Sequence, residues 1–328
     1  MAWRIQLTEG TIKRLDILSG RPSLLAAWLR TDQVVFLDLQ SGVQKNQITL
    51  EAQDFNQRST LFWRAFLETL RAPNNVYLPH VRLKGGSIYS SSDGQKRLYY
   101  AGGRDLFLEI DKQETRLDTT PLAPAQMPTT AQAPSDSSKS ESAPPEVFVS
   151  VGMDRAFGLT AALDGRANLT LFSERTRIGT FPTGLTITED FRPILLVTKG
   201  SSAVIISDGQ RLVALDSTGK IRAQVELYFT LGAMACSSDG RRLVLSDMES
   251  NVVRVYSGVD LRPTHQRFAV DLLAESKRAQ LLAMPEAGRS AVGALAINSK
   301  GALAFAVAGT LCVTSLARMK VVPRSQVF

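Results

Sequence analysis

The side chains that most often perform chemistry in enzymes are scarce in this sequence. The 328 residues contain two histidines, His80 and His265, and two cysteines, Cys236 and Cys312. General acid–base catalysis relies most often on histidine, and zinc sites need several Cys or His ligands at short spacing, which these four residues do not have. The motifs of serine hydrolases, zinc proteases, phosphate-binding loops and dinucleotide-binding folds are also missing. We therefore expect no catalytic residue, no cofactor and no metal site.

Basic side chains are the next candidates, because they can bind an anionic partner. The formal net charge is +7 and the pI is about 9.5. The segment from Ser237 to Phe328 carries twelve Lys or Arg against seven Asp or Glu, a local net charge of +5. Nucleic acid or another polyanion could bind there if the charges converge on one face; the alternative is a scatter of solvated charges. The basic candidates for partner binding are Arg241, Arg242, Arg262 and Arg267.

One segment has the pattern of an amphipathic helix. Asp54, Ser59 or Thr60 could cap the start of the helix at Asp54–Arg71, and Pro73 ends it. Its large apolar side chains fall on one side of a helix: Phe62, Trp63, Phe66, Leu67 and Leu70. This stripe either packs against the rest of the protein or docks a partner. Phe62, Trp63 and Phe66 are therefore candidate partner-binding residues.

A second segment has the composition of a disordered loop. Thr119–Pro145 holds six of the fourteen prolines and no aromatic residue. Such a segment cannot bury enough apolar area to offset the entropy lost on ordering. We expect a disordered loop rich in Pro, Ser, Ala and Thr at 119–145.

The rest of the chain reads as short β-strands separated by turns. Three segments, starting at Gly86, Gly232 and Gly293, repeat the same order of strand, turn, strand, turn and strand. Their first turns carry Asp93-Gly94, Asp239-Gly240 and Lys300-Gly301, and Asp-Gly favours tight turns because both residues tolerate positive φ. A unit that recurs about every forty residues indicates a repeat protein. The fold class is all-β, and weaker copies bring the number of units to about six, or to seven if residues 1–7 pair with irregular segments.

This repeat resembles those of WD40 and YVTN-type β-propellers over nearly the whole chain. The Gly-His opening and Trp-Asp closing dipeptides of WD40 repeats are missing, and third strands end in Leu37-Asp38, Ile110-Asp111 and Leu215-Asp216 instead. The resemblance implies a single β-propeller domain over 1–328, of six or seven four-stranded blades, with the helix at 54–71 and the loop at 119–145 as insertions. Closed rings of blades bury the faces of every sheet against its neighbours.

The leading functional hypothesis is a non-enzymatic protein-binding scaffold, or a subunit of a larger complex, because propellers present rigid loop surfaces. The alternative is a polyanion- or nucleic-acid-binding propeller, and a propeller enzyme comes third. The N-terminal stretch lacks the apolar core of a secretory signal, and no apolar run reaches the ~18 residues that span a bilayer. We therefore expect a cytoplasmic protein without membrane insertion, whose protein partners the sequence does not identify.

Overall fold

The structure of the chain is a computed structural model. The described residues are 2–7, 12–18, 23–29, 33–49, 78–83, 86–90, 96–100, 106–110, 113–117, 148–154, 158–188, 191, 193–198, 203–273, 275, 279, 292–307 and 309–322. The predicted helix at 54–71 and the predicted loop at 119–145 lie outside them.

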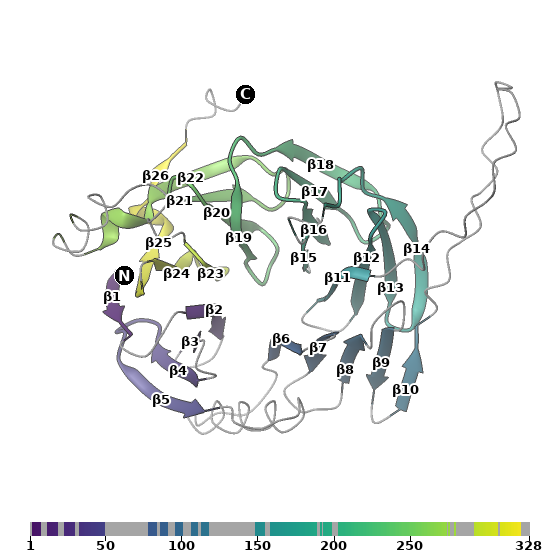
Figure 1. The fold of residues 1–328 in the computed structure, drawn as a ribbon, viewed down its shortest axis with the longest axis horizontal. Coiled ribbons are helices and arrows are strands. Elements are labelled where there is room, and N and C mark those ends of the chain that lie inside the picture. The colour runs from purple at the N-terminus through teal and green to yellow at the C-terminus, as the bar shows by residue number, and fades with distance from the viewer. Residues whose placement is uncertain are drawn as a thin grey trace, which may run out of the picture.

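The described residues form six antiparallel sheets, which Figure 1 shows arranged around a ring. Sheet B contains β2 (Ile12–Leu18), β3 (Leu24–Leu29), β4 (Gln33–Asp38) and β5 (Gln44–Thr49). Sheet C contains β6 (Leu78–Leu83), β7 (Gly86–Ser90), β8 (Lys96–Tyr100), β9 (Leu106–Ile110) and β10 (Gln113–Arg116). Sheet D contains β11 (Phe148–Met153), β12 (Leu159–Asp164), β13 (Asn168–Ser173) and β14 (Thr176–Pro182).

The C-terminal half of the chain forms the other three sheets. Sheet E contains β15 (Ile194–Val197), β16 (Val204–Ser207), β17 (Arg211–Leu215) and β18 (Ile221–Glu226). Sheet F contains β19 (Leu231–Cys236), β20 (Arg242–Asp247), β21 (Val252–Ser257), β22 (Pro263–Phe268) and β26 (Lys320–Val321). Sheet A contains β23 (Ala294–Ile297), β24 (Ala302–Val307), β25 (Thr310–Ser315) and β1 (Trp3–Gln6), and short 3-10 turns follow β22 and β25 at Ala269–Leu272 and Leu316–Arg318. The all-β propeller prediction is confirmed.

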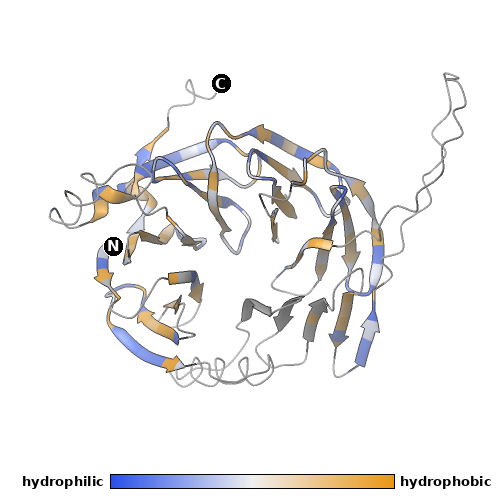
Figure 2. Ribbon diagram, in the orientation of Figure 1, coloured by the Kyte–Doolittle hydropathy of each residue, from blue (hydrophilic) through white to orange (hydrophobic). Residues whose placement is uncertain are grey.

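Burial follows the position of each strand within its sheet. In sheet B, β3 and β4 are buried along nearly their whole length, whereas β5 alternates between exposed and half-buried residues. A short continuous apolar run such as LLAAWL in β3 is what a strand covered on both faces requires. Figure 2 shows the same contrast in colour, since β5 is largely hydrophilic and β4 largely hydrophobic.

Neighbouring sheets share hydrophobic cores. Sheets A and B bury Leu25 and Val35 against Ala296 and Val313, and sheets A and F bury Val253 and Val255 against Phe305 in a similar way. Further clusters join sheet C to D, sheet D to E, and sheet E to F. The blades are therefore held by face-to-face burial of apolar area, the dominant favourable term in folding.

Two details differ from the sequence-based expectations. Sheets C and F have five strands where four were predicted, because β6 adds to β7 and β26 adds to β22. Residues 1–7 do not start a separate unit: β1 pairs antiparallel with β25, with Trp3 opposite Val313 and Gln6 opposite Thr310. The N-terminal strand thus completes the last sheet of the chain, a pairing between distant segments that local sequence patterns cannot reveal.

The Asp-Gly and Lys-Gly turns have the backbone that was predicted. Gly240 has a φ of +68° and Gly301 a φ of +80°, both in the left-handed region. The Ser237 hydroxyl donates to the Asp239 carboxylate at 2.5 Å and accepts the Arg242 N–H at 3.0 Å, which fixes the first of these turns. Gly94 lies outside the described residues.

Candidate binding surface on sheet F

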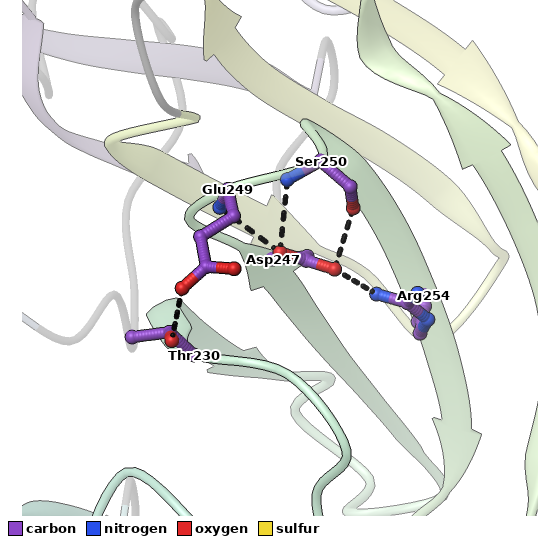
Figure 3. Close-up of polar contacts among 5 residues, drawn as sticks. All are labelled: Thr230, Asp247, Glu249, Ser250 and Arg254. Carbon is purple, nitrogen blue, oxygen red and sulfur yellow. Dashed lines mark hydrogen bonds and ion pairs between the residues drawn. The ribbon is translucent and has the colours of Figure 1, made fainter. Parts of the chain in front are cut away.

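The turn that joins β20 to β21 is organised by Asp247, the last residue of β20. One of its carboxylate oxygens accepts the backbone N–H groups of Glu249 and Ser250, both at 3.0 Å. The other oxygen accepts the Ser250 hydroxyl and the Nη1 of Arg254, the latter at 2.9 Å (Figure 3). Asp247 is only 4% exposed, so its negative charge is held almost entirely by these donors.

The same contacts change the acidity of Asp247. Burial would raise the pKa of this carboxyl, because desolvation disfavours the charged form. Hydrogen bonds from Ser250, Arg254 and the Glu249 backbone act in the opposite direction and prevail, so the pKa lies below its usual value of 3.8. The carboxylate is therefore a permanent anchor for the Arg254 guanidinium at neutral pH.

Arg254 is held from a second side by an aromatic ring. Its Cζ lies 4.3 Å from the centre of the Phe229 ring, in the loop between β18 and β19. Within a range of about 6 Å, such a cation–π contact is favourable. Ion pair and ring contact together fix the guanidinium in one orientation.

The β18–β19 loop is joined directly to the β20–β21 turn. The Met248 N–H donates to the Thr230 backbone oxygen at 2.9 Å, and the Thr230 hydroxyl donates to the Glu249 carboxylate at 2.8 Å (Figure 3). Tyr228, two residues before Thr230, is 83% exposed, and Met248 is 53% exposed.

A groove of about 410 Å³ lies on the same sheet, next to Arg254. Its walls come from β21, β22 and the C-terminal segment that follows β25. The lining residues are Val252, Arg254, Gln266, Arg267, Phe268, Asp271, Arg318 and Lys320. Four cationic side chains thus line the groove against one carboxylate.

The C-terminal segment is fixed to sheet F by backbone and side-chain contacts. Lys320 pairs with Gln266, and the Val322 N–H donates to the Thr264 oxygen at 3.0 Å. Arg267 donates to the backbone oxygen of Arg318 at 2.6 Å, and Met319 is buried in the core between sheets A and F. Residues about fifty positions apart in the sequence therefore share one groove.

The four predicted arginines lie at opposite ends of the sheet. Arg241 lies in the β19–β20 turn, Arg242 begins β20, and Arg262 lies in the β21–β22 turn, where the Gly258 N–H donates to the Arg241 oxygen at 2.8 Å. Arg267 lies near the far end of β22, in the groove. The predicted set does not form one patch, because β22 is extended and its ends are roughly 17 Å apart for six residues.

The three arginines at the turn end have other contacts or are exposed. Arg242 donates to the backbone oxygen of Ser299 in sheet A, and Arg262 forms an exposed ion pair with Asp260 at 3.4 Å. Arg241 is exposed. The other predicted residues, Phe62, Trp63 and Phe66, lie outside the described residues.

Sequence reasoning missed most of the groove. Arg254, Arg318 and Lys320 were counted in the basic C-terminal third but were not singled out. Arg254 had a recognisable pattern, since it is the one charged residue within the strand VVRVYS. Arg318 and Lys320 had none, because their role depends on the pairing of β26 with β22.

Among the residues that the structure describes, no group of three or more His, Cys, Asp or Glu could hold a metal ion. Burial raises the pKa of the Cys312 thiol to about 12, which keeps it protonated at neutral pH. Burial and the nearby Arg242 charge lower the pKa of His265. In the described part of the chain, no helix is long and apolar enough to cross a membrane.

No protein-family model and no curated protein sequence matches this chain. Solved structures do match it. Cps50 (Swd1) from Myceliophteria thermophila, a β-propeller domain, is 10% identical and aligns over 93% of this chain and 82% of its own, with a TM-score of 0.45. Raptor from Chaetomium thermophilum is also 10% identical and aligns over 97% of this chain with a TM-score of 0.58.

This chain spans only 29% of the length of the Raptor chain. At such low identity the similarity concerns the fold alone. Together with the sheets described above, it supports a β-propeller fold for this chain.

Proposed function

We propose that this propeller is a non-enzymatic protein-binding scaffold, or a subunit of a larger complex in the cytoplasm, and that it docks a partner on sheet F. The observation that carries the proposal is the groove, with four cationic residues and the exposed Phe268 in its lining; the exposed Tyr228 is the chain neighbour of Phe229, which contacts Arg254. Arg and Tyr are among the residue types that contribute most to protein interfaces. We further propose that the whole chain is one propeller domain, with the insertions at 54–71 and 119–145.

The surface is preorganised for binding. Arg254 is fixed by Asp247 and Phe229, and the loop carrying Tyr228 is hydrogen-bonded to the adjacent turn. A rigid surface loses little conformational entropy when a partner docks, so more of the interaction energy appears as affinity. This supports a stable docking role.

Co-purification with a tagged protein from native cells tests the proposal. The double variant Arg318→Glu with Lys320→Glu reverses two exposed charges in the groove. Arg241→Glu with Arg262→Glu is the matched control, because it makes the same charge change at the other end of the same sheet. We expect specific partners to co-purify with the wild type and the control and to be lost from the groove variant. Equal recovery with all three proteins would contradict docking on this surface.

The cationic lining also favours a second candidate function, binding of a nucleic acid or another polyanion. Such binding weakens with salt by a slope of roughly 0.9 per neutralised phosphate on a logarithmic plot. The test is binding of a labelled duplex and a labelled single strand at increasing salt. A steep slope that flattens in the groove variant alone would support this candidate, whereas the absence of binding at low salt would exclude it.

A further inference from the structure

The groove on sheet F has a cationic end and an apolar end, and this arrangement indicates one kind of ligand. We propose that it binds a short, extended acidic segment of a partner protein in which an apolar side chain and a carboxylate alternate. This inference rests on the proposed scaffold function and specifies the partner's chemistry.

The charges favour a carboxylate ligand. Asp247 already pairs with Arg254 at 2.9 Å. Among the ion pairs between described residues, none involves Arg267, Arg318 or Lys320, and Asp271, which also lines the groove, has contacts of its own. The groove therefore has positive charge left to neutralise, and arginine clusters are a recurring means of recognising acidic motifs.

The strand register places an apolar end next to the cationic end. Val252 is opposite Phe268, whereas Arg254 is opposite Gln266, which is in turn opposite Lys320. Cross-strand partners project from the same face of a sheet, so these five residues form one surface. Phe268 is 54% exposed and has room for an apolar contact.

The spacing of the two ends matches an extended peptide. Val252 and Arg254 are two residues apart on one strand, a distance of about 6.6 Å. An extended ligand has the same spacing between side chains on one of its faces. An apolar residue over the exposed Phe268 would thus place the acidic residue two positions away, at Gln266 and Lys320.

Size and composition favour a peptide over a nucleic acid. A volume of about 410 Å³ holds a few side chains, as ligand pockets of this size do. The apolar end at Phe268 offers no charge to a continuous phosphate backbone, whereas it can contact an apolar side chain of a peptide. A nucleic acid is therefore the competing outcome of the test.

The experiment measures fluorescence anisotropy of short labelled peptides with the full-length protein. The probe alternates Glu with Leu; one control replaces Leu with Ser, a second replaces Glu with Lys, and a labelled oligonucleotide of equal charge is the third. The variants are Lys320→Glu and Phe268→Ser in the groove, and Arg262→Glu and Val259→Ser as matched controls at the other end of the sheet. Thermal melting confirms that each variant remains folded.

We expect the Glu–Leu peptide to bind best, and each groove variant to weaken its binding by about tenfold or more, since each removes a charge pair or an apolar anchor. The control variants should change binding less than about twofold. The proposal is overturned if the peptide does not bind, if the control variants weaken it equally, or if the oligonucleotide binds more tightly through the same residues. If the peptide does not bind, but partners co-purify with the wild type and are lost from the groove variant, the proposed acidic motif is wrong and the scaffold function stands.

Discussion

The Trp3 indole N–H donates to the backbone oxygen of Leu39 at 2.9 Å and so connects the first strand of the chain to the turn after β4. Trp3 belongs to sheet A, through β1, whereas Leu39 follows sheet B. The indole also lies over Gly42, where an added Cβ would come within 2.8 Å of the Trp3 ring. This one side chain therefore links the last sheet to the first.

Removal of this link should destabilise the protein. Trp3→Ala removes a half-buried aromatic ring and a hydrogen bond, so we expect a loss of about 2–3 kcal/mol in the free energy of unfolding. Trp3→Phe keeps most of the packing and should cost only about 1 kcal/mol. Urea denaturation measures both values. An unchanged midpoint for Trp3→Ala would mean that β1 does not contribute to ring closure.

The Gly240 turn provides a test of backbone strain. Its φ of +68° disfavours any β-branched residue, so Gly240→Val should destabilise the protein by roughly 1–3 kcal/mol. Gly293→Val is the matched control, because no atom lies within 4 Å of a Cβ added there and its φ is not positive. Chemical denaturation of both variants separates strain from side-chain size. Equal costs at the two positions would show that the turn carries no special constraint.

Asp247 should make stability depend on pH in an acidic range. Its folded-state pKa is below the usual 3.8, so its stabilising contribution is complete above that pH and is lost as the pH falls through the lower folded value. Asp247→Asn should therefore cost about 2 kcal/mol at neutral pH and progressively less below about pH 4. Denaturation midpoints of wild type and variant across this range measure the difference.

Asp260→Asn is the exposed control for this titration: the Ser257 hydroxyl also lowers the pKa of Asp260, but its ion pair with Arg262 is open to solvent, which screens the charge. Exposed pairs contribute about 0–1 kcal/mol, so this variant should differ little from the wild type. A stability gap between wild type and Asp247→Asn that stays constant down to the most acidic pH would refute the lowered pKa.

The predicted helix at 54–71 can be tested through its aromatic stripe. If Trp63 and Phe66 pack within the protein, changing both to alanine should lower stability by several kcal/mol, following the ~3–5 kcal/mol of a buried aromatic. If they dock a partner, stability should stay nearly constant while co-purification is lost. Thermal melting and co-purification of the double variant distinguish the two. If the double variant keeps both its stability and its co-purifying partners, the stripe has neither role.

Much of the fold could be predicted from local patterns in the sequence. The three segments that start at Gly86, Gly232 and Gly293 contain β7, β19 and β23, each the first strand of its repeat. Strand patterns have a period of two residues, and Asp-Gly requires a special backbone only at the turn itself. Both features act over a few residues, so a single sequence contains them.

The candidate site depended on contacts that no local pattern encodes. Arg262 and Arg267 are close in sequence, yet the extended β22 separates them, whereas Gln266 and Lys320 are distant in sequence and pair directly. The all-β class, the repeated strand–turn units and the basic character of the C-terminal third follow from the order of residues alone, because each is a local or compositional property. Which cations share a groove and which strand closes the ring follow from hydrogen bonds and packing between strands far apart in the chain.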